Sequence, residues 1–348
     1  MTKGLVSILL LNYNGREFLK DCITSVLNQT YTRFELIFFD NCSTDGSAGF
    51  VWNIFNDDRI KLHTSEKNLG FAGGNNKALE YAKGEYIVLL NNDTLVESNW
   101  LEELVKCVSA SDKTGMAQSL VYTEGIPLRY YEKNGTVNLL GHNIMEVFSI
   151  NDDGTGEIVQ ANGCSLIIKR EVLEKVNGLF IGDYFAYAED TFLSLKVLLA
   201  GYKIMHNALS VVHHKGSSTM KKYKSEFTTF YQERNRILNF LILFSKSFRI
   251  KYILLFIINF KIKFFYSLFS KRYSLKGIAR AYFWILGNHK WIKQMRKEYA
   301  VIKTVDEKEV LSKLSGKYAN GDNFLEKILN LISLTYLRIV RIKTIELS

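Results

Sequence analysis

Short apolar runs alternate with stretches of helical spacing over the first two hundred residues. Strand-like runs are predicted at 6–11, 35–39, 60–63, 86–90 and 165–169. Between them, apolar residues recur every three or four positions, which predicts helices over 16–28, 47–55, 75–82, 100–108 and 190–200. This alternation is typical of an α/β fold with a mostly parallel, doubly wound sheet, which binds ligands at the carboxyl ends of its strands.

The pattern changes at two places along the chain. Residues 117–151 contain turn signals and the only proline, Pro127, which predicts an irregular segment that shapes a substrate face. From residue 227 onward, apolar residues keep helical spacing while basic residues fill the gaps, and 323–342 repeats this theme. We therefore predict a catalytic α/β domain over 1–226 and a basic amphipathic helical region over 227–348.

Charge is distributed unevenly along the chain, whose formal net charge is +10. Residues 1–220 carry 19 basic and 26 acidic side chains, whereas residues 221–348 carry 26 basic and 9 acidic ones. A basic region beside an acidic domain suggests an anionic partner, either lipid headgroups or nucleic acid. Motifs expected of nucleic-acid binding are not found in the sequence, which favours the lipid surface.

A basic amphipathic helix is typical of an element that lies on a membrane surface. The apolar run 252–260 lies between Lys251 and Lys261, and it is too short for a spanning helix, which needs about 20 apolar residues. We expect a peripheral protein on the inner face of the cytoplasmic membrane. The alternative is that the same apolar face packs against the catalytic domain or a sister subunit.

The cysteines and the N-terminal apolar run bear on the compartment. The four cysteines show no CxxC pair or metal-ligand spacing, which predicts reduced thiols in a cytoplasmic protein. The apolar run 5–11 leads directly into Asn12-Tyr13-Asn14, without a small-residue cleavage site. It is therefore predicted to be a buried strand rather than a signal peptide.

Polar residues follow the predicted strands, where an α/β sheet binds its ligands. Asp40 ends the second strand and could accept the imide N–H of uracil or thymine, although a turn role is equally open. The glycine-rich stretch 68–76 could turn its backbone N–H groups toward a diphosphate, or could be a plain loop. It lacks the G-x-G-x-x-G order, which argues against a dehydrogenase.

Acidic residues and histidines supply the remaining candidate chemistry. Asp93 follows the apolar strand 86–90, where it could hold Mg²⁺ or Mn²⁺ or could cap a helix. Glu189-Asp190 opens a helix, so it could complement the helix dipole or provide a general base. His213-His214-Lys215 could bind metal or diphosphate, or be structural.

Taken in order, these motifs resemble those of the family 2 glycosyltransferases, which have a GT-A fold. The match covers roughly the first two-thirds of the chain, and the Asn-Leu-Gly-Phe and Asn-Asn-Asp forms are most similar to a rhamnosyltransferase-like branch. The motifs are Asn12-Tyr13-Asn14, Asp40-Asn41-x-Ser43-x-Asp45-Gly46-Ser47, Asn68-Leu69-Gly70-Phe71-Ala72-x-Gly74-x-Asn76, Asn91-Asn92-Asp93, Glu189-Asp190, His214-x-Gly216-x-Ser218 and Arg234-Asn235.

The resemblance implies an inverting glycosyltransferase that uses a nucleotide-sugar donor, dTDP-rhamnose or a UDP-sugar, and a glycan acceptor. A lipid-linked glycan acceptor would fit an enzyme docked on a membrane by its basic helical region. The resemblance also implies that Asp93 holds a divalent metal with His214 nearby, and that Asp190 is the catalytic base, oriented by Glu189. The implied nucleotide site consists of Asn12, Asn14, Asp40, Asn68, Gly70, Asn76 and Asn92.

One residue departs from the family pattern. Asn91 stands where the first aspartate of an Asp-x-Asp motif is expected, and an amide is a weaker metal ligand than a carboxylate. This departure keeps open a binding subunit that has lost activity. A nucleotidyltransferase is the other alternative, although Glu189-Asp190 would then have no obvious purpose.

Overall fold

The protein consists of two compact units. The computed structural model describes residues 1–123, 136–144, 151–215, 225–269, 273–321 and 323–347. The first unit comprises 1–134, 147–185 and 202–217, and the second comprises 135–146, 186–201 and 218–348. The second unit therefore holds more than the helical region predicted from residue 227, because it also contains Glu189 and Asp190.

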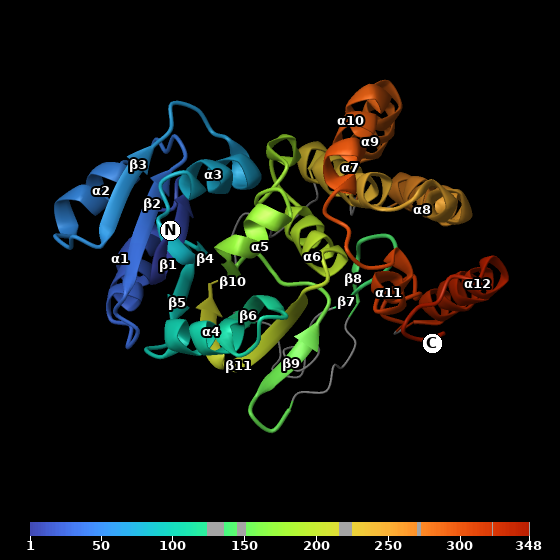
Figure 1. The fold of residues 1–348 in the computed structure, drawn as a ribbon. Coiled ribbons are helices and arrows are strands. Elements are labelled where there is room, and N and C mark those ends of the chain that lie inside the picture. The colour runs from blue at the N-terminus through green and yellow to red at the C-terminus, as the bar shows by residue number, and fades with distance from the viewer. Residues whose placement is uncertain (124–135, 145–150, 216–224, 270–272, 322, 348) are drawn as a thin grey trace. The chain divides into compact units, whose positions relative to one another are not determined.

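One mixed sheet forms the framework of the first unit (Figure 1). In the described residues its order is β3-β2-β1-β4-β10-β6-β11-β5, and β9 pairs with β11. Strands β1 to β4 pair in parallel, as do β6 and β11, whereas β5, β9 and β10 run antiparallel to their neighbours. The strands are β1 (Thr2–Asn12), β2 (Phe34–Asp40), β3 (Ile60–Thr64), β4 (Gly84–Asn91), β5 (Thr94–Val96), β6 (Thr114–Thr123), β9 (Thr155–Ile158), β10 (Ser165–Lys169) and β11 (Lys203–His214).

Helices cover this sheet and close its core. Val6, Ile8 and Leu10 alternate along β1 and are fully buried in one cluster with apolar side chains of α1 and α4. All seven residues of β2 are buried, as expected for a parallel strand covered on both faces. The helices of the first unit are α1 (Arg16–Leu27), α2 (Ser47–Ile54), α3 (Gly70–Leu79), α4 (Trp100–Ser109) and α5 (Arg170–Lys175), with the 3₁₀ turn η2 (Gly182–Tyr184).

Two predicted elements differ from the structure. The stretch 117–123, predicted to be irregular, belongs to β6, which lies between β10 and β11. Helix α3 begins at Gly70, five residues before the predicted start at Asn75. Glycine disfavours helix by propensity, but an added Cβ on Gly74 would lie 2.5 Å from Leu11 Cδ1, so glycine permits the close approach of α3 to β1.

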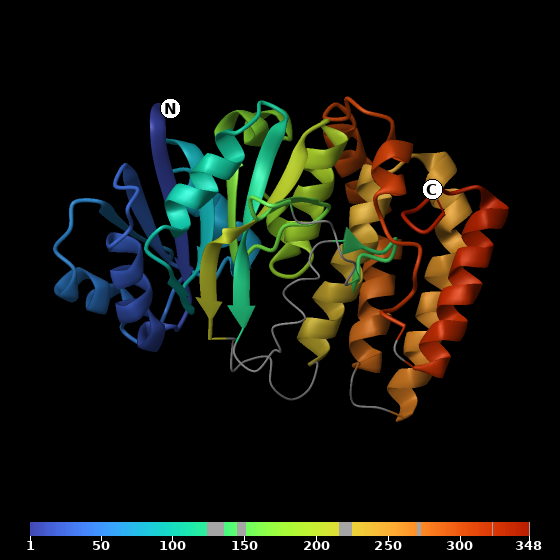
Figure 2. The ribbon, with the colours of Figure 1, turned by 90° about the horizontal axis from the view of Figure 1, so that it is seen from below.

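The second unit is mainly helical, and its long helices lie alongside one another (Figure 2). Helix α6 (Glu189–Leu199) packs against α7 and α11, and every one of its residues except Asp190 is buried. A short hairpin, β7 (Thr136–Val137) with β8 (Asn143–Ile144), belongs to the same unit. The other helices are α7 (Glu226–Leu243), α8 (Lys246–Phe269), α9 (Leu275–Gly287), α10 (His289–Ala300), α11 (Glu307–Ser312) and α12 (Phe324–Val340).

Helix α8 is longer than the apolar run 252–260 that the sequence singled out. It extends over 24 residues because Lys251, Lys261 and Lys263 lie within the helix and do not end it. Among the described residues it is the one helix that is long and apolar enough to cross a membrane, judged by length and composition alone. The prediction that this segment is too short to span was therefore wrong on length.

We expect Gly84→Ala to lower the free energy of unfolding by about 1–3 kcal/mol, a typical cost of overpacking. Gly84 begins β4, and an added Cβ would lie 2.6 Å from Leu5 O and 2.7 Å from Ser7 N, so backbone atoms of β1 would have to shift. Urea unfolding measures the change. Gly49→Ala in α2 is the control, because its Cβ meets nothing within 4 Å and alanine favours the helix by about 0.5–1 kcal/mol. Equal stability changes in both variants would contradict this account.

Candidate functional site

The predicted polar strand ends lie together at one edge of the sheet. The register pairs Asn12 of β1 with Asp40 of β2, and Leu11 of β1 with Asn91 of β4. The three parallel strands β2, β1 and β4 are neighbours in the sheet (Figure 1). By this register their carboxyl ends are level. Ligands of open α/β sheets bind outside this edge, so the register supplies a platform for the polar residues.

Asp40 is buried and takes part in a hydrogen-bond network with its neighbours. Asn12 Nδ2 donates to Asp40 Oδ1 at 2.9 Å, and Ser43 N donates to Asp40 Oδ2 at 2.9 Å. The turn role that the sequence left open is thus present. A carboxylate has about four acceptor positions, so these two bonds leave capacity for a further donor such as a base imide N–H.

Asn14 and Asn92 join the same network from two sides. Asn14 N donates to Ser43 Oγ at 2.9 Å, Asn14 Oδ1 accepts from Thr44 N at 2.8 Å, and Asn92 Nδ2 donates to Asn12 Oδ1 at 2.7 Å. Asn14 has a φ of +52°, a conformation that asparagine tolerates better than most residues. The structure therefore brings Asn12, Asn14, Asp40 and Asn92 together, and their role in nucleotide binding stays a prediction.

Asn41 is a site residue that the prediction did not select. It is 1% exposed, and its side chain anchors the turn that leads into α3. Its Oδ1 accepts from Leu69 N at 2.9 Å, and its Nδ2 donates to Asn68 Oδ1 and to Gly70 O, each at 3.1 Å. Its place directly after Asp40 at a strand end was the available signal, but the sequence could not show which way the side chain points.

The three predicted residues of the glycine-rich stretch have different local roles. Asn68 Oδ1 accepts from Gly70 N at 2.8 Å, and Gly70 has a φ of +71° at the start of α3. An added Cβ on Gly70 would lie 2.4 Å from Phe185 O, so this position requires glycine. Asn76 instead pairs with the backbone of Phe180, its Nδ2 donating to the carbonyl at 2.9 Å and its Oδ1 accepting from the amide at 3.1 Å.

Asp93 and His214 form a close pair. His214 Nε2 lies 3.2 Å from Asp93 Oδ1, and the two side chains are 18% and 10% exposed. Strand β5, not a helix, follows Asp93, so the helix-cap alternative for Asp93 is excluded. Pairing of β5 with β11 places Thr94 opposite His214, which explains why residues 121 positions apart meet.

The other two members of the His213-His214-Lys215 motif point elsewhere. His213 Nε2 lies 2.7 Å from Glu97 Oε1, and its ring stacks against Tyr122. Lys215 Nζ lies 3.3 Å from Asp21 Oδ2 at the surface. Neighbouring side chains on a strand alternate between faces, so His213 and His214 do not act on the same ligand. Gly216 and Ser218 lie outside the described residues.

The Asp93–His214 pair suits a divalent cation that shares its ligands with a substrate. Carboxylate oxygen and imidazole nitrogen are both ligands for Mn²⁺, and Mg²⁺ is commonly held by one or two carboxylates plus substrate phosphates. In the part of the chain that the structure describes, no group of three or more His, Cys, Asp or Glu side chains could hold a metal. The protein residues at this place could therefore provide part of a coordination shell, which phosphate oxygens and water would complete.

Glu189 and Asp190 belong to the second unit, at the start of α6. Burial and the neighbouring Asp190 carboxylate raise the pKa of Glu189. Its Oε2 has no hydrogen-bond partner among the described residues. Asp190 is the only residue of α6 that is not buried, and its Oδ1 accepts from Thr191 N at 2.7 Å. Asp190 is thus the accessible carboxylate of the two.

The backbone before α6 has an unusual conformation. Phe185, Tyr187 and Ala188 have φ values of +61°, +73° and +62°. Positive φ costs a non-glycine L-residue roughly 1–2 kcal/mol. Such conformations cluster at active sites and persist only where the surroundings impose them. The sequence contains no glycine here that would have signalled this turn.

Comparison with known protein families identifies a relationship. The model of the family described as glycosyl transferase family 2 matches residues 7–176. The chain is 30% identical over 219 residues, 60% of its length and 82% of the relative's, to a putative teichuronic acid biosynthesis glycosyltransferase of Bacillus subtilis, TuaG. It is 43% identical over 102 residues to the Escherichia coli UDP-Glc:alpha-D-GlcNAc-diphosphoundecaprenol beta-1,3-glucosyltransferase WfgD, covering 29% of this chain and 40% of the relative.

A solved structure agrees with the predicted fold. The mannosyltransferase PcManGT from Pyrobaculum calidifontis, crystallised with GDP-Man and Mn²⁺, matches with a TM-score of 0.51 at 17% identity. The match covers 97% of this chain and 85% of that one. At this identity the likeness concerns the fold alone, and it confirms the predicted GT-A type α/β fold. The rhamnosyltransferase-like branch stays a prediction.

We expect Asn41→Ala to lower the free energy of unfolding by about 1–3 kcal/mol, because the partly buried Leu69 amide and the buried Gly70 carbonyl lose their partners. The Leu69 amide should also exchange its hydrogen faster, since it donates to Asn41 Oδ1. Hydrogen exchange read by mass spectrometry over residues 66–74 measures this effect. Thr44→Ala, at an exposed position on the same loop, is the control. Unchanged exchange at Leu69 would contradict the anchoring role of Asn41.

Proposed function

Because the chain belongs to glycosyl transferase family 2, we propose that it is an inverting glycosyltransferase acting in cell-surface polysaccharide synthesis. It transfers a sugar from a UDP- or dTDP-sugar to a hydroxyl of a lipid-linked glycan. The observation that carries the proposal is the network at the carboxyl ends of β1, β2 and β4, followed by the Asp93–His214 pair. The network offers hydrogen-bond acceptors for a pyrimidine base. The pair offers part of the coordination shell of a cation bound to the diphosphate.

The first unit binds the donor in this proposal. Asp40 accepts the imide N–H of the pyrimidine, and Asn12 donates to the Asp40 carboxylate. Asn14 and Asn92 hold the surroundings of that pair, through bonds to Ser43 and to Asn12. Asn68, Gly70 and Asn76 shape the turn into α3, next to the nucleotide. Asp93 and His214 would hold Mg²⁺ or Mn²⁺, which supplies positive charge to the leaving diphosphate. Asn91 at the first position of the motif is compatible with this, because substrate oxygens would supply further ligands.

The second unit provides the base that removes the proton in this proposal. Asp190 takes the proton from the acceptor hydroxyl as that oxygen attacks the anomeric carbon. The nucleotide diphosphate leaves from the opposite face, so a single displacement inverts the anomeric centre. Glu189 is buried, and its raised pKa favours the protonated, neutral form, which leaves Asp190 as the carboxylate that acts as base.

The named relatives support the choice of substrates. The E. coli relative is a glucosyltransferase named for a UDP-Glc donor and a diphosphoundecaprenol-linked acceptor. The B. subtilis relative is named for teichuronic acid biosynthesis. These names favour a UDP-sugar and a lipid-linked acceptor for the present chain. The Asn-Leu-Gly-Phe and Asn-Asn-Asp motifs keep dTDP-rhamnose as the second donor to test.

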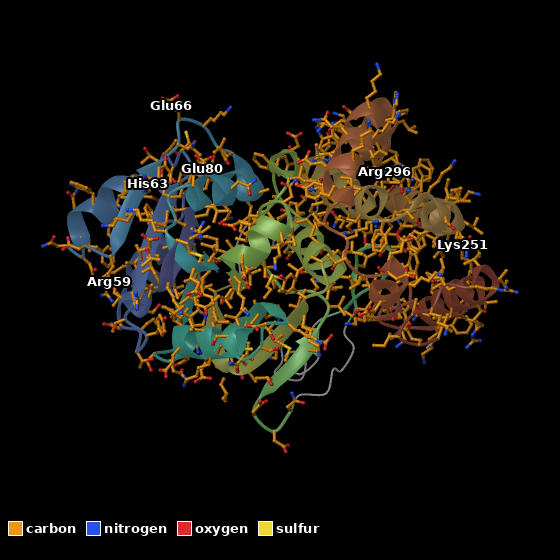
Figure 3. The ribbon with its side chains drawn as sticks, viewed as in Figure 1. Arg59, His63, Glu66, Glu80, Lys251 and Arg296 are labelled. Carbon is orange, nitrogen blue, oxygen red and sulfur yellow. The ribbon has the colours of Figure 1, made fainter. Side chains whose placement is uncertain are left out.

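We further propose that the basic region 227–348 holds the enzyme on the cytoplasmic face of the membrane. Helix α8 exposes large apolar side chains. It also carries exposed basic side chains, such as that of Lys251 (Figure 3). The exposed apolar residues of α8 include Ile250, Ile253, Leu254, Ile257, Phe265, Leu268 and Phe269, and Phe269 is 89% exposed. Such a surface suits the boundary between headgroups and acyl chains, and each nearby Lys or Arg adds about 1 kcal/mol on anionic lipid.

The buried face of α8 favours lying on the membrane over crossing it. It consists of Phe248, Tyr252, Leu255, Asn259 and Lys263, spaced three or four residues apart. Lys263 Nζ lies 2.5 Å from Glu233 Oε1 of α7, and Asn259 Oδ1 accepts from Tyr318 Oη at 3.2 Å. A helix whose buried polar groups are paired within its own unit would lose these bonds if it were inserted across the bilayer.

We expect release of nucleotide diphosphate from one member of a panel of UDP-, dTDP- and GDP-sugars supplied with undecaprenyl-diphosphate-linked glycans. Asp190→Asn should lower turnover by about 10²–10⁴-fold, the usual contribution of a general base. Asp93→Asn and EDTA should each lower turnover as well, because Asp93 would hold the cation with His214. Coupled detection of nucleotide diphosphate measures the rates. Glu97→Gln, at the exposed acid paired with His213, is the control and should keep wild-type turnover.

Two other results would assign a different function. Nucleotide binding without release from any donor would indicate a non-catalytic subunit. Release of pyrophosphate from a nucleoside triphosphate and a sugar phosphate would indicate a nucleotidyltransferase.

We expect the protein to float with vesicles containing anionic lipid, and the triple variant Phe265→Ser, Leu268→Ser, Phe269→Ser to lose this binding. These side chains are 60%, 51% and 89% exposed, so the substitutions remove apolar area without opening the interior. Trp52→Ser in α2, where the side chain is 76% exposed, is the matched control. High salt should weaken binding, because it screens the basic residues.

Point substitutions are preferable to deletion of the helical region. The second unit also contains α6, so removal of residues after 227 would expose the buried helix that carries Asp190. Extraction at alkaline pH separates the two modes of attachment, because it releases a peripheral protein and retains one whose α8 spans the bilayer. Equal flotation of the triple variant and the wild type would contradict the proposed surface.

A further inference from the structure

The turn before α6 is held in place by two buried asparagines of α7. Asn235 Nδ2 donates to Ala186 O at 2.9 Å and to Tyr187 O at 2.8 Å. Asn239 Nδ2 donates to Ala188 O at 3.0 Å. Three consecutive carbonyls of the positive-φ turn are therefore fixed from one helix. Asn235 and Asn239 lie four residues apart on α7, hence on one face, and neither is exposed.

Arg234 sets the orientation of the Asn235 amide. Arg234 Nε donates to Asn235 Oδ1 at 2.9 Å, and its guanidinium lies 4.8–5.0 Å from the ring centres of Phe230, Tyr231 and Trp284. Arginine can only donate, and backbone carbonyls can only accept. The oxygen of the amide must therefore face Arg234, which directs its nitrogen toward the turn.

The turn in question determines where α6 begins. Ala188 is the N-cap residue of α6, with φ of +62°, and Asp190 is the second residue of the helix. The carbonyl of Ala188 also accepts the first intrahelical bond, from Phe192 N at 3.1 Å. Neither Tyr187 nor Ala188 is glycine, so their positive φ values must be imposed by the surroundings. The three asparagine bonds are contacts of this kind, because they fix the carbonyls of the turn.

We propose that Asn235 and Asn239 are positioning residues, which hold the 186–188 turn so that the Asp190 carboxylate keeps the orientation needed for proton removal. The proposal rests on the proposed function of Asp190 as general base. Neither asparagine needs to touch a substrate for this role. Their effect is transmitted through the backbone of the turn to the start of α6, and it concerns the rate of the chemical step rather than donor binding.

The test compares Asn235→Ala, Asn239→Ala and the double variant with the wild type. We expect kcat of the double variant to fall by about 100-fold, the size of loss that a misplacement of about 1 Å can cause. The KM for the donor should change less than about twofold, because the groups assigned to the nucleotide lie in the first unit. Gln232→Ala on the same helix is the control, since its side chain has one long hydrogen bond, 3.4 Å from Arg236 Nη2.

A double-mutant comparison distinguishes positioning from general stability. If Asn235 acts through Asp190, Asn235→Ala should lower the residual turnover of the Asp190→Asn enzyme by less than about twofold. A purely structural role would lower turnover by the same factor in both backgrounds, through loss of folded protein. Equal loss in both backgrounds would overturn the proposal. So would wild-type kcat in the variant that combines Asn235→Ala with Asn239→Ala.

The same series keeps the two hypotheses apart. Wild-type turnover by Asp190→Asn alone would overturn the assignment of the base and, with it, the positioning role. Strongly reduced turnover of Asp190→Asn, combined with equal further losses from Asn235→Ala in both backgrounds, would overturn the positioning role only. If Asn235→Ala is recovered unfolded, Asn239→Ala, which removes one of the three bonds, and Asn235→Asp, which keeps the size but replaces the donor, carry the comparison.

Discussion

A buried asparagine amide has to satisfy both its donors and its acceptor, and the loops of this protein are organised around that constraint. Asn12 connects Asp40 to Asn92 across three strand ends. Asn41 ties the turn before α3, and Asn235 with Asn239 ties the turn before α6. In each case an amide replaces regular backbone pairing where the chain leaves a strand or enters a helix.

Glycines of the first unit allow neighbouring segments to approach the asparagine network and helix α3 closely. Gly15 lies so near the network that an added Cβ would be 2.2 Å from Asn92 Nδ2 and 2.9 Å from Asn12 Oδ1. Gly70 and Gly74 allow α3 to approach Phe185 and β1. The amides therefore sit in spaces that larger residues would fill. Both residue types are needed to keep polar side chains at the end of a sheet whose strands are otherwise apolar.

The helical region has a structural role beyond the proposed membrane attachment. Helix α6, which carries Glu189 and Asp190, belongs to the unit formed by α7 to α12, and α7 contacts the turn that starts it. The apolar face of α8 and the asparagine face of α7 are thus parts of one unit. The proposed base and the proposed membrane surface lie in this one unit. Proton removal and membrane binding would therefore both depend on the packing of the same helices.

The amino-acid sequence determined the α/β class, the strand ends and the residue types at them. Its periodicity identified β1, β2 and β4, because buried parallel strands are continuous apolar runs, and polar residues stop them abruptly. It placed Asn12, Asp40 and Asp93 at strand ends for the same reason. These are local properties, so a local pattern is enough to reveal them.

Tertiary structure alone decided which of these residues meet and what holds them. Only the pairing of β5 with β11 brings Asp93 to His214 and separates His213 from it. Only packing explains a helix that starts at Gly70, a strand at 117–123, and positive φ at Tyr187 and Ala188. Contacts between residues far apart in the chain override local propensity there, and a single sequence contains no record of which distant residue will satisfy a buried polar group.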